Sequence, residues 1–109
     1  MNFKARIYIA GPYSKGDPEQ NVYNAIETAN KLADMGYAPY VPHFTHFWHT
    51  KYPRPYNFWL ELDNQFLPFC DAVIRIPGES SGADKEVELA RKIGKPIFFS
   101  IQELEGFNG

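Results

Sequence analysis

Segments rich in β-forming residues alternate along this chain with segments of helical periodicity, and this alternation constrains the fold more than any other feature. The predicted strands span residues 6–10, 37–41, 71–76 and 96–100. A predicted helix separates each strand from the next. Strands that alternate with helices form a parallel sheet covered on both faces, with right-handed crossovers. The sequence therefore predicts one α/β domain, residues 1–109, built as a three-layer sandwich around a small parallel sheet of about four strands.

The first predicted helix begins at Val22 and ends before Gly36, which lies where a C-terminal cap belongs. Its apolar residues recur at spacings of three and four, so they share one helical face. They are Val22, Ala25, Ile26, Ala29, Leu32 and Ala33. This face is expected to pack on the sheet.

Two further helices are expected. One spans residues 58–67, and the other runs to Gly94 from a capping box formed by Ser81 and Asp84. Residues 43–56 precede the first of these and are rich in aromatic residues and proline, so we expect an irregular segment there.

Composition excludes several classes of protein. The formal net charge is −2 and no run of Lys or Arg occurs, so a nucleic acid polymer is not an expected partner. No apolar stretch approaches the roughly 20 residues that cross a bilayer, so no membrane span is expected. The single cysteine, Cys70, excludes an intramolecular disulfide, and no basic-then-apolar leader opens the chain. These features predict a cytoplasmic protein.

The expected topology also predicts where a ligand binds. In open parallel sheets, ligands bind beyond the C-terminal ends of the strands, where the strand order reverses. Three segments meet this condition: residues 11–21, the chain from Pro42 onward, and residues 77–86. Candidate functional residues are therefore sought in these segments.

Glu86 is the first candidate. The apolar stripe of its predicted helix consists of Ala83, Val87, Ala90 and Ile93. Glu86 lies at the edge of this stripe, whereas Glu88 points away from it. A carboxylate in a first helical turn is also favoured by the helix dipole alone. The functional alternative is that Glu86 faces the cleft and attacks an anomeric carbon, forming a covalent glycosyl intermediate.

Asp63 is the second candidate. It lies on the buried stripe of its helix, which also holds Trp59, Leu62 and Phe66. Glu61 and Asn64 face outward. A buried carboxylate needs partners, so Asp63 could simply hydrogen-bond a neighbouring loop. Alternatively, it could protonate a leaving base while Glu86 takes the sugar.

Three motifs together resemble the nucleoside 2-deoxyribosyltransferase superfamily. The first is Ile-Tyr-Ile-Ala-Gly-Pro at residues 7–12, and the second is Asp63, eight residues before the Asp-Ala-Val of residues 71–73. The third is Ser-Ser-Gly-Ala-Asp-Lys-Glu at residues 80–86. Their order and spacing match as well as their residue types, and the likeness spans nearly the whole chain.

This resemblance implies a flavodoxin-like or Rossmann-like fold and cleavage of N-glycosidic bonds through a glutamate nucleophile. The glycosyl group then passes to another base or to water. Glu86 matches the nucleophile and Asp63 the acid near the leaving base. Tyr8 matches a strand tyrosine whose hydroxyl orients the glutamate, although a tyrosine in a strand is also an ordinary core residue. Asp71 matches a family aspartate just ahead of the third strand. Because the N-terminal end of that strand is far from the expected cleft, Asp71 is expected to be structural.

Ser80 departs from the transferase pattern. The resemblance implies an aspartate six residues before the nucleophile in the transferases, and a serine there in relatives that hydrolyse nucleoside 5′-monophosphates. Ser80 and Ser81 at a helix start would suit a phosphate, as would the loop that contains Ser14 and Lys15. Ser81 is equally explained as a helix N-cap, and the loop as a surface turn. Transferase and hydrolase therefore both remain open.

The expected substrate-binding residues come from these motifs and from the second strand end. They are Gly11, Pro12, Ser14, His43, Ser80, Ser81 and Gly82. Few residues follow the fourth predicted strand, whereas the larger transferases continue with a segment that completes a neighbouring subunit's site. The base-side pocket is therefore expected to come mainly from the chain after the second strand.

His43, His46 and His49 recur at every third residue among several aromatic side chains. Such a row could indicate a metal site, but a helical row of this spacing drifts around the axis and nearby prolines oppose a long helix. We expect instead that His43 borders the substrate and that the aromatic residues stack on a base or form a subunit contact. A homo-oligomer, dimer or higher, is the expected assembly.

The sequence therefore predicts an enzyme that acts on a small nucleoside or nucleotide and uses no metal or organic cofactor. A second interpretation, from a different class, is a module on the same fold that binds nucleotides without turnover.

Overall fold

The computed structural model describes all residues, 1–109, and contains four strands and four α-helices. In chain order these are β1 (Arg6–Ala10), α1 (Pro18–Asp34), β2 (Ala38–Tyr40), α2 (Thr45–Lys51), α3 (Tyr56–Phe66), β3 (Ala72–Arg75), α4 (Ser81–Lys92) and β4 (Ile97–Phe98). Short 3₁₀ turns lie at Pro42–Phe44, Leu67–Phe69 and Gln102–Leu104.

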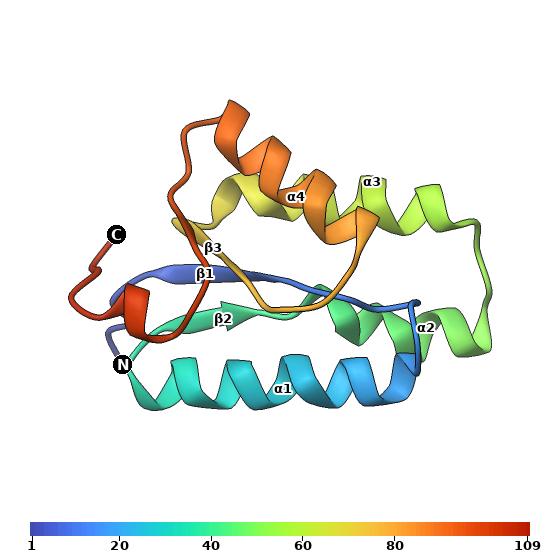
Figure 1. Cartoon of the computed structure of the whole chain (residues 1–109), viewed down its shortest axis with the longest axis horizontal. Coiled ribbons are helices and arrows are strands. Elements are labelled where there is room, and N and C mark those ends of the chain that lie inside the picture. The colour runs from blue at the N-terminus through green and yellow to red at the C-terminus, as the bar shows by residue number, and fades with distance from the viewer.

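The four strands form one parallel sheet in the order β2-β1-β3-β4. Helix α1 covers one face, and α3 and α4 cover the other (Figure 1). The predicted α/β three-layer sandwich is therefore confirmed. The chain runs outward from β1 to β2 and then returns to the other side of β1, so the order reverses between β1 and β3. Their C-terminal ends are where a ligand is expected to bind in such a sheet.

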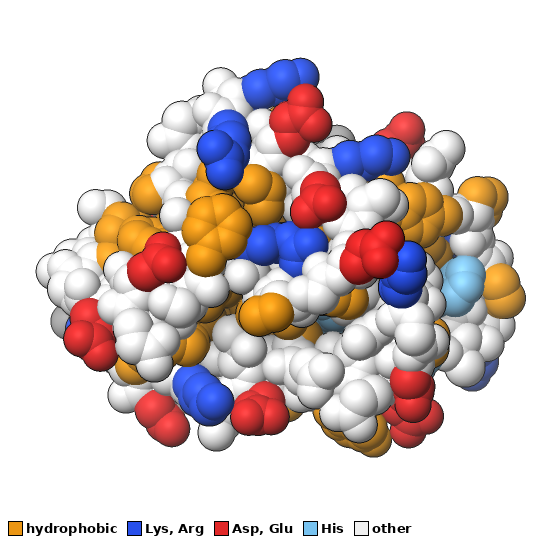
Figure 2. Space-filling model, viewed as in Figure 1, with side chains coloured by type: hydrophobic (Ala, Val, Ile, Leu, Met, Phe, Trp, Pro, Cys, Tyr) orange, Lys and Arg blue, Asp and Glu red, His pale blue; other side chains and the backbone are white.

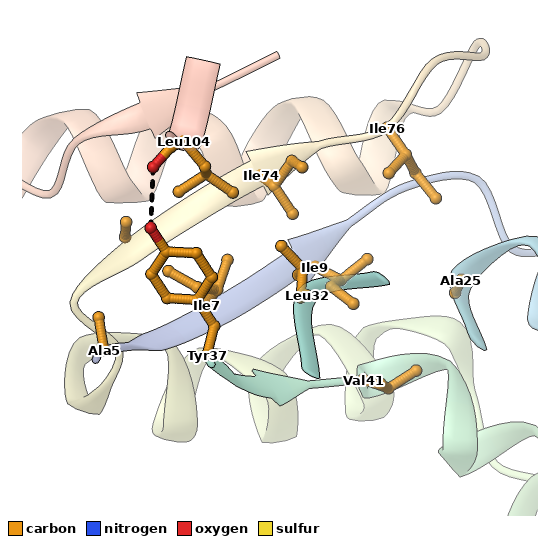
Figure 3. Packing of buried hydrophobic residues seen from close by; sticks show 11 residues of the cluster. Ala5, Ile7, Ile9, Ala25, Leu32, Tyr37, Val41, Ile74, Ile76 and Leu104 are labelled. Atoms are coloured by element: carbon orange, nitrogen blue, oxygen red, sulfur yellow. Dashed lines mark hydrogen bonds between the residues drawn. The ribbon is translucent and has the colours of Figure 1, made fainter. Parts of the chain in front are cut away.

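Alternation of side chains along the strands produces two separate cores. Ile7 and Ile9 face α1, whereas Tyr8 and Ala10 face α3 and α4. The same alternation places Ile74 with the first pair and Val73 with the second. Figure 3 shows the α1-side cluster around Ile7, Ile9 and Ile74. Both faces are therefore apolar and covered, as a parallel sheet requires.

The C-terminal segment closes the α1-side core. Leu104 is fully buried in that cluster. The Tyr37 hydroxyl lies 2.8 Å from the carbonyl oxygen of Leu104 (Figure 3) and 2.6 Å from that of Phe107, and its single hydrogen is shared between the two acceptors. These bonds fix the 3₁₀ turn over the end of the sheet, away from the C-terminal strand ends.

The first helix begins four residues earlier than predicted. Asp17 is its N-cap and accepts hydrogen bonds from the backbone N–H of Glu19 and Gln20, and Pro18 occupies the first helical position. The prediction missed this start because it rested on apolar periodicity, which begins only at Val22. Ala33, predicted to lie on the buried face, is exposed.

Residues 43–56 are more regular than predicted. A 3₁₀ turn over Pro42–Phe44 leads directly into α2, and α3 begins at Tyr56. The prolines of this segment predict a break in helical structure. Pro42 instead occupies the first turn, where a missing N–H costs nothing, and Pro55 is the N-cap of α3.

The cap of α4 is also displaced from its predicted position. Ser80 is the N-cap, and its Oγ accepts from the N–H of Ala83 at 3.0 Å. The predicted box of Ser81 and Asp84 does not form, and Asp84 instead pairs with Arg75 at 3.1 Å. Ile93, assigned to the apolar stripe, is 41% exposed because it follows the last helical residue.

Charged side chains of both signs are interspersed over the face shown in Figure 2, with no broad area of one sign. This distribution agrees with the formal net charge of −2. None of the helices has both the length and the apolar character needed to span a membrane.

Candidate active site

A pocket lies at the C-terminal ends of the strands, at the point where the strand order reverses. Its walls come from the loops after β1, β2 and β3, from α2, and from the facing sides of α3 and α4. The lining residues are Gly11, Tyr13, Ser14, Pro42, His43, Thr45, His49, Tyr56, Trp59, Leu60, Asp63, Ser80, Gly82, Ala83 and Glu86. The topology therefore brings together residues from all three predicted segments.

Glu86 and Tyr8 meet at the base of this pocket. The Tyr8 hydroxyl donates a hydrogen bond to Oε2 of Glu86. Tyr8 is fully buried in β1, and Glu86 is only 6% exposed. Glu86 lies in the second turn of α4, beyond the first turn that holds Asp84, so a first-turn dipole contact does not explain its position. Glu88 is exposed, as predicted.

Asp63 approaches the same pocket from α3. It is 9% exposed, and its Oδ1 has no hydrogen-bond partner in the chain. The structure therefore shows no hydrogen bond between Oδ1 of Asp63 and a neighbouring loop, which was the alternative interpretation of this residue. Trp59 on its stripe is buried as predicted, but Phe66 is 45% exposed and stacks on Tyr40 instead of entering the core.

Burial raises the pKa of both carboxyl groups, that of Asp63 to about 7 and that of Glu86 to about 8. For Glu86 the burial effect is opposed by the Tyr8 hydrogen bond and by the positive charge of Arg75, whereas the charge of Asp63 adds to it. Because the two carboxylates repel, the two pKa values belong to the pair. Tyr8 donates to Glu86, so we place the first negative charge on Glu86. Burial also raises the pKa of Tyr8, which stays protonated.

Two glycines give the pocket its shape. A side-chain carbon on Gly82 would lie 2.4 Å from the Tyr56 hydroxyl oxygen, and one on Gly11 would lie 2.2 Å from Ile76 Cγ1. Both separations are too short for non-bonded atoms. Glycine at these positions therefore allows α4 and the loop after β1 to approach their neighbours.

The candidate residues for a phosphate are divided between two places. Ser80 and Ser14 line the pocket. Ser81 is exposed and lines a second hollow next to the pocket, which shares part of its wall. Pro12 does not line the pocket. Lys15 pairs with Glu79 at 2.9 Å, and this exposed pair joins the loops after β1 and β3.

The three histidines do not converge on one point, and no group of three metal-ligating side chains forms anywhere in the chain. His43 contacts the backbone after β1, and His46 Nδ1 lies 2.6 Å from the Tyr13 hydroxyl. His49 Nδ1 accepts from Trp59 Nε1 at 2.8 Å. Each imidazole therefore has a separate structural partner.

Asp71 lies at the opposite end of the sheet, where its Oδ2 accepts from the Arg6 backbone N–H at 2.8 Å. Its predicted structural position is therefore correct. Tyr56, one of the aromatic residues expected to stack on a base or form a subunit contact, lines the pocket. Conversely, the sequence did not identify Trp59 as a pocket residue. Its aromatic side chain was the available signal, but helical periodicity assigned Trp59 only to the core.

The fold and pocket define a class: a flavodoxin-like parallel α/β protein with two buried carboxyl groups at the switch point of its sheet. Residues 5–100 match the family described as "Domain of unknown function (DUF7768)", and the chain belongs to that family. No curated protein matches the sequence.

A solved structure with the same fold is that of a 2-deoxyribosyltransferase from the psychrotolerant bacterium Bacillus psychrosaccharolyticus. The TM-score is 0.61 at 19% sequence identity, over 85% of this chain and 69% of that chain. This similarity shows that the two proteins share a fold.

Proposed function

We propose that this protein cleaves the N-glycosidic bond of nucleosides or their 5′-monophosphates through a covalent intermediate on Glu86. The observation that carries the proposal is the Tyr8–Glu86 hydrogen bond beside Asp63 in one pocket. The similarity of fold to a 2-deoxyribosyltransferase and the family motifs in the sequence add support.

In the first step, a carboxylate oxygen of Glu86 attacks C1′ of the sugar, and the bond from C1′ to the base nitrogen breaks. The bonding electrons leave with the base, which takes a proton from Asp63. In the second step, water or another base attacks C1′ and gives its proton to the ionised Asp63, while the bond to Glu86 breaks and its electrons return to the Glu86 carboxylate. Two easier displacements replace one difficult one.

The electrostatics of the pocket suit these roles. Burial raises the pKa of both carboxyl groups, to about 7 and about 8, so the pair keeps one proton near neutral pH. The nucleophile must be the ionised member, and the hydrogen bond that Tyr8 donates to Glu86 favours the charge on Glu86 and the proton on Asp63. Tyr8 is therefore a positioning residue that also favours the charged form of Glu86.

Hydrolysis of a 5′-monophosphate is the variant of this function that Ser80 favours. Its hydroxyl lies in the pocket lining at the N-terminus of α4, where backbone N–H groups and the helix dipole attract anions. An aspartate, which the transferase pattern carries here, would repel a phosphate. Transfer to a second base is the other variant.

The assembly and location of the protein also remain proposals. Phe44, Phe47 and Tyr52 are each more than half exposed around α2, as expected of a surface that joins copies in a homo-oligomer. Sedimentation would measure the number of subunits. The cytoplasmic location stays a prediction from the sequence.

One assay tests the activity. The protein is incubated with nucleosides and their 5′-monophosphates, with and without a second free base, and base release is followed by chromatography. Exchange of bases identifies a transferase, and release without an acceptor identifies a hydrolase. Binding without release from any substrate would contradict the proposal and support the non-catalytic nucleotide-binding interpretation.

A further inference from the structure

His43 is held in one orientation by the backbone of the loop after β1. Its Nε2 lies 3.3 Å from the carbonyl oxygen of Gly11 and 3.1 Å from that of Pro12. The side chain is 5% exposed and lines the pocket that also contains Glu86 and Asp63. The position of this imidazole is therefore tied to the first strand end.

These contacts determine which ring nitrogen carries the hydrogen. Carbonyl oxygens only accept, so Nε2 must donate and must carry the N–H. Burial lowers the pKa of His43, which keeps the ring neutral near pH 7. In the neutral ring the other nitrogen, Nδ1, then has a free lone pair and acts only as an acceptor.

No protein group donates to this acceptor. Nδ1 is buried and has no hydrogen-bond partner in the chain. A buried acceptor without a partner is unfavourable, and a donor that reaches it removes that penalty. His43 lines the pocket and Nδ1 is covered by neighbouring atoms, so a bound ligand that displaces this cover can supply the donor.

We propose that His43 Nδ1 accepts a hydrogen bond from the substrate and thereby selects ligands with an N–H or O–H group at this position. The inference rests on the proposed function for its ligand class, a nucleoside or nucleotide. Three donor groups of such a ligand are compared: the exocyclic amino group of adenine, the 2′-hydroxyl and the 3′-hydroxyl. An oxo group in place of the amino group presents a second acceptor and is disfavoured.

Matched ligand pairs identify the donor. Binding is measured by calorimetry in a Glu86→Gln background, which releases no base during the titration. The pairs are 2′-deoxyadenosine against 2′-deoxyinosine for the amino group, adenosine against 2′-deoxyadenosine for the 2′-hydroxyl, and 2′-deoxyadenosine against 2′,3′-dideoxyadenosine for the 3′-hydroxyl. We expect one pair to differ about tenfold or more in affinity, in favour of the ligand with the donor.

Two substitutions separate this role from a structural one. In His43→Gln the amide N–H can replace Nε2 and still donate to Gly11 and Pro12, but no acceptor remains at Nδ1. In His43→Asn the amide oxygen can replace Nδ1, while the loop contacts are lost. Selectivity should therefore disappear in the Gln variant and persist in the Asn variant. His46→Gln, outside the pocket lining, is the control and should keep the parent's selectivity.

The proposal is overturned if no pair differs in the parent, or if the difference survives in His43→Gln. Should the Gln variant not fold, ¹⁵N NMR of the unsubstituted protein decides instead. The Nδ1 resonance should be that of an unprotonated nitrogen. It should shift when the ligand with the donor group binds but not when the matched ligand without that group binds. A resonance that does not change with either ligand overturns the inference.

Base release by the unsubstituted protein distinguishes failure of this inference from failure of the proposed function. If the protein releases base but the two ligands of every pair bind equally, only the proposed role of His43 is contradicted. If one pair differs in affinity through His43 but no base is released, catalysis is contradicted and the role of His43 as an acceptor is retained. Absence of both contradicts both.

Discussion

The Tyr8 hydroxyl donates to Oε2 of Glu86 across 78 positions of the sequence. Tyr8 comes from the central strand β1, and Glu86 comes from α4 on the face that β1 presents to it. The bond is buried, so it is electrostatically stronger than the same bond in water. It holds a carboxylate oxygen in place at the edge of the sheet where the pocket opens.

Glu86→Gln should reduce base release by at least about 10³-fold, because the amide is a far weaker nucleophile while shape and most contacts remain. Chromatographic measurement of single-turnover rates tests this, and calorimetry should show that nucleoside binding persists. Glu88→Gln, which changes an exposed glutamate on the same helix, is the matched control and should retain activity. Equal rates for Glu86→Gln and the unsubstituted protein would contradict the assignment of the nucleophile.

Tyr8→Phe should lower kcat about 10-fold or more with little change in substrate binding. A hydrogen bond to a charged group contributes about 1.5–3 kcal/mol, and its loss also raises the pKa of Glu86 by about one unit or more. The acid limb of the pH–rate profile should therefore move to higher pH. Tyr37→Phe removes a buried hydroxyl on the opposite face and should lower stability without moving the profile. An unmoved profile in Tyr8→Phe would argue against its positioning role.

The pH dependence of activity should be bell-shaped. The reactive pair has one proton, so activity falls when both carboxyl groups are protonated and again when both are ionised. Because the pair titrates with pKa values of about 7 and about 8, the maximum is expected between these values. Rates of base release from pH 5 to 10 measure it. A plateau that extends undiminished to pH 10 would exclude a proton donor of this kind.

Stability should fall as pH rises from about 4 to about 8. In the folded state the pKa values of Asp63 and Glu86 are raised, so the folded protein binds more protons than the unfolded chain across this range. The stability contributed by the protonated groups is complete below the pKa values that these groups have in the unfolded chain. It is lost as pH rises past the pKa values that they have in the folded protein. Asp63→Asn should therefore be more stable than the unsubstituted protein at pH 8, by about 1–4 kcal/mol, and similar at pH 4. Urea unfolding at both pH values measures the difference, and a constant difference would contradict the cause given.

Ser80→Asp should weaken binding of a 5′-monophosphate relative to its nucleoside through charge repulsion. Aspartate is also a favourable N-cap, so α4 should keep its start. Ser80→Ala loses the cap bond to Ala83 and should cost about 1 kcal/mol of stability without introducing a charge. Calorimetry with both ligands measures the preference. Unchanged selectivity in Ser80→Asp would place the phosphate elsewhere.

Local sequence was enough to predict the strands and the general type of fold. Runs of β-forming residues and the helical spacing of apolar residues are both visible within short segments of the sequence. The strand β1 and the apolar face of α1 could therefore be recognised directly. Boundaries set by polar caps were less accurate, because Asp17 and Ser80 act through hydrogen bonds that periodicity does not report. The helix α2 was not predicted because nearby prolines were expected to break helical structure. A proline breaks a helix when it lies in the helix interior, but in a first turn it favours helix formation.

The sequence by itself determined that Glu86 lies at the edge of a buried helical stripe and that Asp63 lies within one, since both follow from position on a helix. Only the tertiary structure decided that these groups share a pocket with His43, that Tyr8 donates to Glu86, and that Asp63 Oδ1 and His43 Nδ1 lack partners. Those relationships join residues from four different elements. They depend on the reversal of strand order between β1 and β3, which long-range packing sets and no local pattern encodes.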